Sequence, residues 1–64
     1  MSPTDVDAYR SMAATLWALA WEDYRRARQA DDPIERDALR LLGRTHARAS
    51  RRWDALARLG QEET

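Results

Sequence analysis

Residues 30–35 read "ADDPIE", and this short stretch decides the fold. Asp32 is a preferred helix-capping residue, and Pro33 suits the first position of a helix. Glu35 stands where a capping box places an acidic side chain. Because the residue before a proline resists the α conformation, any preceding helix has to end ahead of it. The stretch therefore predicts a turn at residues 30–32 between two helices.

The flanking sequence supports a helix on each side of this turn. Ser2, Pro3 and Asp5 repeat the same start signal near the beginning of the chain, and Gly60 is a plausible C-terminal stop. No run alternates with a period of two, so strands are not expected. We expect an all-α antiparallel helical hairpin that forms a single domain over residues 1–64. Its predicted parts are helices at residues 4–29 and 33–59 and a frayed acidic tail at residues 60–64.

Apolar residues cover a wide arc of the first predicted helix. Trp17, Trp21 and Tyr24 lie on one flank of this arc, and Met12 and Leu19 lie on the other. The arc spans roughly 200°, whereas a single packing partner needs a stripe of about 100°. One hairpin partner is therefore not enough to cover this helix. Its central line, at about 100° per residue, holds six residues: Val6, Tyr9, Ala13, Leu16, Ala20 and Ala27.

The second predicted helix has a narrower apolar stripe, about 120° wide. The stripe consists of Ile34, Ala38, Leu41, Leu42, Thr45, Ala49, Trp53, Leu56 and Leu59. Alternating steps of three and four residues indicate a helix-packing seam, as in a heptad repeat. The predicted seam consists of Leu39, Leu42, His46, Ala49, Trp53 and Leu56.

The length of the chain points to self-assembly. The chain has 64 residues, no cysteine and a single histidine. Chains this short usually depend on disulfides, a metal or oligomerisation for stability. We therefore expect a homodimer, or a complex with an equivalent helical partner, that forms a four-helix bundle with alanines at the close contacts. Trp17 and Trp21 would then lie at the boundary between subunits.

Composition and charge bear on the source and the location of the protein. All eleven basic residues are arginine, and the net charge is zero. This bias is typical of a GC-rich bacterium or one of its phages. The first residues lack the positive charge of a signal peptide, and the longest apolar stretch is about half of a membrane span. We expect a cytoplasmic protein without membrane contact, because the polar face of the first helix is not basic.

The residues that carry enzymatic chemistry are missing from the sequence. His46 has no carboxylate three or four residues away, and Ser50 makes a His-Ser pair without an orienting acid. There is no glycine-rich phosphate loop and no Glu-x-x-His motif of the kind that holds a di-iron site in some bundles. We expect a non-enzymatic protein with no cofactor and no bound metal.

Two functional hypotheses remain. The first is a small regulatory or adaptor protein that acts through helical protein–protein contacts, because tryptophan and arginine dominate interface energies. Its expected contact residues are Trp17, Trp21, Tyr24, Arg25, Arg28 and Trp53. The alternative is a nucleic-acid-binding regulator, because like charges repel unless an anion neutralises them. Its expected contact residues form an arginine ridge on the second helix, away from the tryptophans: Arg36, Arg40, Arg44, Arg48 and Arg51.

The layout of the chain resembles the Rop (repressor of primer) family. The resemblance lies in one hairpin with an aspartate-containing bend near its middle, and in "LARLG" at residues 56–60 before an acidic tail. It implies a dimer of helical hairpins, and in that family the first helix reads paired RNA loops with basic and polar side chains. The polar face of the first helix here is acidic and small. The resemblance therefore extends to the architecture, and no RNA-binding residue is carried over.

Overall fold

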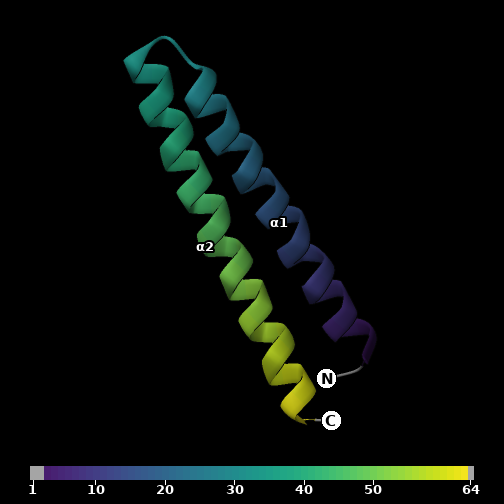
Figure 1. Cartoon of the computed structure of the whole chain (residues 1–64). Helices are drawn as coiled ribbons and strands as arrows, with labels where there is room; N and C mark the ends of the chain where they lie inside the picture. Colours follow the sequence, from purple (N-terminus) through teal and green to yellow (C-terminus); the bar gives the residue numbers. More distant parts are fainter. Residues whose placement is uncertain (1–2, 64) are drawn as a thin grey trace.

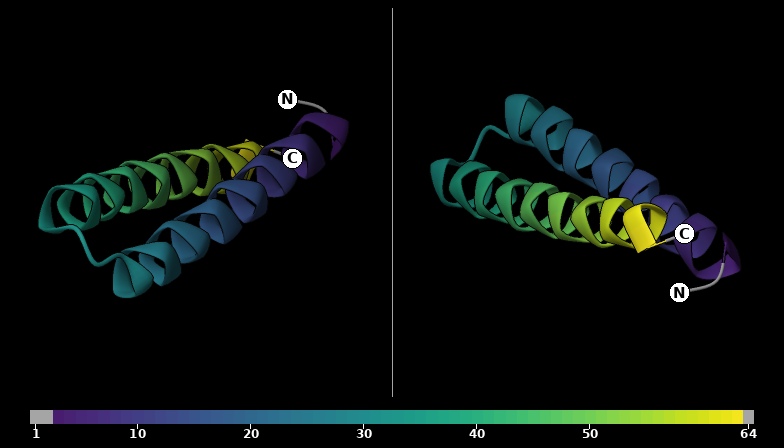
Figure 2. Two further views of the ribbon diagram at one scale, coloured as in Figure 1. Left: turned by 90° about the horizontal axis from the view of Figure 1, so that it is seen from above. Right: turned by 90° about the horizontal axis from the view of Figure 1, so that it is seen from below.

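The computed structural model describes residues 3–63, which form two helices. Helix α1 spans Pro3–Gln29 and helix α2 spans Pro33–Glu63. The helices run antiparallel and side by side in a rod about 49 Å long, with both chain ends at the same end (Figures 1 and 2). No strand occurs within residues 3–63. The predicted all-α helical hairpin is confirmed.

The turn has the capping geometry that its sequence predicts. The Asp32 carboxylate accepts the N–H of Ile34 at 3.0 Å, and the Asp32 carbonyl accepts the N–H of Arg36 at 2.9 Å. The Arg36 guanidinium reaches back to the carbonyl of Ala30 at 3.0 Å. Arg36 thus satisfies a carbonyl just after the end of α1 while it stands in the first turns of α2. The cap predicted at Ser2 lies outside the described residues.

The predicted end of the second helix is wrong. Helix α2 continues through Gly60 to Glu63, so residues 61–63 are helical rather than a frayed tail. A glycine ends a helix by adopting the left-handed conformation, and no glycine in residues 3–63 has a positive φ. Gly60 is instead buried within the helix. Thr64 lies outside the described residues.

The buried face of α1 is the predicted central line. Val6, Ala13, Ala20 and Ala27 are buried at seven-residue intervals. Between them, Tyr9 and Leu16 are half-buried. The line also contains Asp23, which is 4% exposed. The predicted line omitted it because it was drawn from apolar residues. Alternation of three and four residues along this line is the spacing of two helices packed at a small angle.

The buried face of α2 differs from the predicted seam. Leu39, His46 and Trp53 are half-buried as that seam requires, but Leu42 and Leu56 are 43% and 40% exposed. The buried positions of α2 are instead occupied by small residues outside the predicted seam: Gly43, Ala47, Ser50, Ala57 and Gly60. Small side chains let two helix backbones approach closely, and a leucine at these positions would hold them apart. Leu42 and Leu56 therefore lie beside the line of contact with α1 and not within it.

Aromatic rings on α1 pack against small or aromatic partners on α2. A Cβ atom added to Gly43 would lie 3.0 Å from Cε1 of Tyr24, so the tyrosine ring rests directly on the glycine. Near the chain ends, the rings of Tyr9 and Trp53 are 5.3 Å apart between centroids. These contacts fix the register of the hairpin at two well-separated points.

The contact between Tyr24 and Gly43 generates a stability prediction. In a Tyr24→Ala background, Gly43→Ala should raise the free energy of unfolding by about 1 kcal/mol, the helix-propensity difference between the residues. With Tyr24 present the gain should be smaller, because the ring has to shift to admit the methyl group. Urea unfolding of the four proteins at one concentration measures both effects. Equal gains in the two backgrounds would show that the ring contact does not restrict position 43.

Candidate interaction surfaces

An aromatic groove runs along one side of the hairpin, between α1 and α2. Its volume is about 220 Å³. Trp17 and Trp21, both about half exposed, form one wall together with Tyr24, and their indoles pack edge to face with centroids 6.3 Å apart. Ala20 and Ala47 also line the groove, and Arg51 borders it from α2. Three of the residues predicted to bind a partner are thus brought together.

A second groove extends the first toward the chain ends. It has a volume of about 370 Å³ and shares Trp17 and Arg51 with the aromatic groove. Arg10 and Asp54 are its charged lining residues besides Arg51, and the carboxylate of Asp54 bonds to Arg58 at 2.9 Å. The expectation that the tryptophans lie away from the arginine ridge is therefore wrong at Arg51. We call the aromatic groove and the second groove together the extended groove. Alanines form its apolar floor, and Arg10 and Arg51 lie on its rim.

The opposite side of the hairpin carries an exposed apolar surface, which we call the leucine face. Apart from Ala49, which is half-buried, its side chains are at least 40% exposed, although most are leucines. The exposed Thr15 and Thr45 donate their hydroxyls to carbonyls of their own helices, four residues earlier in the chain. The leucine face consists of Met12, Leu19, Leu42, Ala49 and Leu56.

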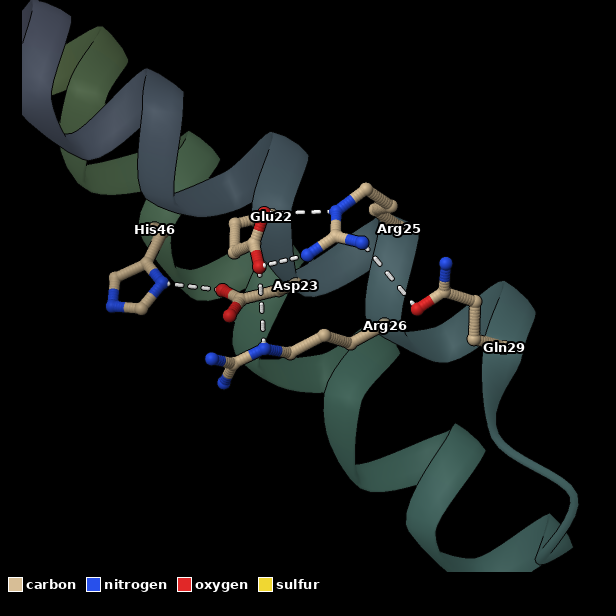
Figure 3. Close-up of polar contacts among 6 residues, drawn as sticks. All are labelled: Glu22, Asp23, Arg25, Arg26, Gln29 and His46. Atoms are coloured by element: carbon tan, nitrogen blue, oxygen red, sulfur yellow. Dashed lines mark hydrogen bonds and ion pairs between the residues drawn. The ribbon is translucent and has the colours of Figure 1, made fainter.

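The remaining predicted contact residues lie elsewhere. Trp53 is half-buried against Tyr9 and does not line the aromatic groove. Arg25 is bound by the Glu22 carboxylate and by Gln29 along its own helix (Figure 3). Its hydrogen bond lowers the pKa of Glu22 and raises that of Arg25. Arg28 is exposed, lies seven residues beyond Trp21 on α1, and does not line the aromatic groove.

The arginine ridge is only partly neutralised by the chain itself. Arg36 is engaged at the turn, and Arg40 lies 4.0 Å from the carboxylate of Asp37. Arg44, Arg48 and Arg51 have no carboxylate partner among the residues that the structure describes. The unpaired charge is therefore concentrated in the middle of α2, at the level of the aromatic groove.

A buried polar pair joins the two helices on the seam. Asp23 Oδ2 lies 2.6 Å from His46 Nδ1, and the side chains are only 6% and 24% exposed (Figure 3). Asp23 is 23 residues from His46 in the chain, so the absence of a carboxylate three or four residues from His46 did not predict this pair. The available signal was the position of Asp23, three residues after Ala20 on the central line of α1. A buried carboxylate needs such a partner, since an unpaired charge in the interior is costly.

Ser50 is the second buried polar residue of the seam. Its hydroxyl donates to the carbonyl of Ala13 at 2.7 Å, across the two helices. Asp23 is an acid bonded to His46, but the hydroxyl proton of Ser50 is directed to a main-chain carbonyl. No bond joins Ser50 to His46 in residues 3–63. In this arrangement the three side chains tie the helices together and do not form a nucleophile–base pair.

Neither helix offers, within residues 3–63, a segment of the length and apolarity needed to cross a bilayer. The same residues contain no cluster of three side chains suited to hold a metal ion. Comparison of the chain with protein-family models, with curated proteins and with solved structures finds no match. The surfaces described above are therefore the basis for assigning a function.

The Asp23–His46 pair generates a second prediction. His46→Ala should lower the free energy of unfolding by about 1–3 kcal/mol, because it leaves the buried carboxylate without its partner. The double variant Asp23→Leu/His46→Leu should be close to wild type, since well-packed apolar residues often replace a buried pair of polar side chains without loss. Chemical unfolding at one fixed protein concentration tests both. Additive costs of Asp23→Leu and His46→Leu would mean that the pair does not stabilise the hairpin as a unit.

Proposed function

We propose that the chain is a non-enzymatic interaction module, a small regulatory or adaptor protein that acts through helix–helix contacts. In this proposal two copies associate through their leucine faces into a four-helix bundle. The observation that carries it is the exposure of the large apolar side chains of α2 rather than their burial against α1. A bundle of this kind also has the architecture that the resemblance to the Rop family implies.

The surface area of the hairpin supports association. The chain has a mass of 7.4 kDa and exposes 4824 Å². A compact monomer of that mass exposes about 4200 Å², so the excess is roughly 600 Å². A standard protein interface buries about 800 Å² on each partner. The excess is therefore close to the area that one partner would cover.

The core of the hairpin also supports association. Among the described residues, no large side chain is fully buried, and the apolar core consists of one valine and five alanines. Small side chains remove little apolar area from water, so they contribute little hydrophobic stabilisation. The leucines that could contribute more are on the leucine face. A second copy would bury them.

The leucine face is complementary to a second copy of itself. Leu42 and Leu56 lie seven residues before and after Ala49 on the same side of α2. If a second α2 packs antiparallel with Ala49 against Ala49, each Leu42 meets the Leu56 of the other chain. A twofold axis through Ala49 therefore generates two identical leucine contacts, as a closed dimer requires. The half-buried alanine at the axis permits close approach.

Sedimentation equilibrium tests this assembly directly. The protein should have twice the mass of one chain, and Ala49→Glu should reduce it to the mass of one chain, because two charges would be buried at the axis. Ala18→Glu, a matched change at an exposed site of α1 outside the leucine face, should leave the dimer intact. A wild-type hairpin that stays monomeric and folded at micromolar concentration would contradict the proposal.

Nucleic-acid binding remains the second candidate function, because Arg44, Arg48 and Arg51 have no carboxylate partner within residues 3–63. Arginine contacts to phosphates release counterions, so such binding would weaken steeply as salt rises. Aromatic-anchored protein contacts depend far less on salt.

Fluorescence anisotropy with a labelled single-stranded RNA at two salt concentrations distinguishes the two functions. For an interaction module we expect no RNA binding near physiological salt. Salt-sensitive binding that Arg44→Glu/Arg48→Glu abolishes and Trp21→Ala leaves intact would instead establish the alternative.

A further inference from the structure

We propose that the extended groove binds an acidic amphipathic helix of a partner protein, with an apolar anchor on the alanine floor beside the tryptophan wall. This inference rests on the proposed interaction function and gives the chemistry of its partner. It concerns the side of the hairpin opposite the leucine face, which a second copy bound there would leave open.

The dimensions of the groove suit a short helix. Its lining on α1 runs from Arg10 to Tyr24, which is roughly 21 Å at 1.5 Å per residue. A partner helix of about four turns has the same length, and it presents anchors at positions i, i+3 or i+4 and i+7. The floor is made of alanines from both helices, Ala20 of α1 and Ala47 of α2. A branched or aromatic side chain of the partner would find apolar contacts there on both helices.

The rim of the groove specifies the charge of the partner. Arg10 and Arg51 line the groove, and neither has a carboxylate partner in the described part of the chain. Asp54, the acid in the lining, is bonded to Arg58. The unpaired rim charge is therefore positive. A partner helix with glutamates or aspartates beside its apolar face would neutralise it, which favours the correct partner and its orientation.

The geometry of the tryptophans favours a protein helix over a nucleic acid. The planes of Trp17 and Trp21 are inclined by 85°, so the edge of one indole occupies a face of the other. Parallel aromatic faces that would sandwich a base are therefore missing at this pair. The groove instead offers a concave apolar floor, which is typical of helix-in-groove recognition.

The test uses a fluorescent synthetic peptide of about 18 residues, with leucines on one helical face and glutamates elsewhere. Two control peptides accompany it: one has glutamine for every glutamate, and one has the same composition in scrambled order. The full-length protein should bind the acidic peptide and bind both controls much more weakly. Trp21→Ala should weaken binding by about tenfold or more, since tryptophan anchors dominate such interfaces. Arg51→Gln should weaken it by a smaller factor, because rim charges contribute less.

A matched control variant is available within the same helix. Arg48 is exposed and unpaired like Arg51, but it does not line the groove. Arg48→Gln should therefore leave peptide affinity unchanged. Circular dichroism and sedimentation of each variant verify that it keeps the fold and the mass of the wild type.

Several results would overturn the inference. One is the absence of peptide binding by the folded protein, and another is binding that does not change in Trp21→Ala. A third is displacement of the peptide by single-stranded RNA with equal losses in Arg51→Gln and Arg48→Gln, which would indicate a non-specific polyanion surface. A wild-type protein that sediments as a monomer and still binds the peptide would contradict the proposed dimer. The same result would support peptide binding in the groove.

Discussion

The close approach of α1 and α2 is the constraint on which the rest of the structure depends. Alanines on α1 face glycine, alanine and serine on α2, so the helices meet over small side chains along much of the rod. Such a seam excludes larger residues from the interior. The leucines of α2 and the tryptophans of α1 are consequently placed on the two sides of the hairpin. The exposed surfaces described above follow from this one choice of packing.

The sequence predicts the backbone better than the packing. The capping signal of Asp32 and Pro33 placed the turn correctly, because caps act through local hydrogen bonds that neighbouring residues determine. The apolar line of α1 was also correct. On α2 the spacing of three and four residues selected Leu42 and Leu56 over Gly43 and Ser50, although close helix packing needs side chains of small volume. Sequence periodicity alone does not reveal which of two possible seams is used.

The surfaces were predicted in part for the same reason. Grouping Trp17, Trp21 and Tyr24 required only helical spacing on one element, whereas placing Arg51 beside them required the register between two helices. Asp23 and His46 likewise meet only across that register. Together with the bond from Ser50 to Ala13, this pair gives the seam polar contacts that a shifted alignment of the helices would break. Buried polar contacts can in this way select one alignment of otherwise similar alanine surfaces.

The position of the aromatic groove has a consequence for valency. The groove and the leucine face lie on opposite sides of the hairpin, so a dimer joined through its leucine faces would carry two equal grooves directed away from each other. One partner helix could then occupy each groove independently. A partner that is itself dimeric would be unable to close on a single bundle and would link successive bundles into open chains. A partner with two binding segments on a long linker would instead gain avidity from both grooves of one bundle.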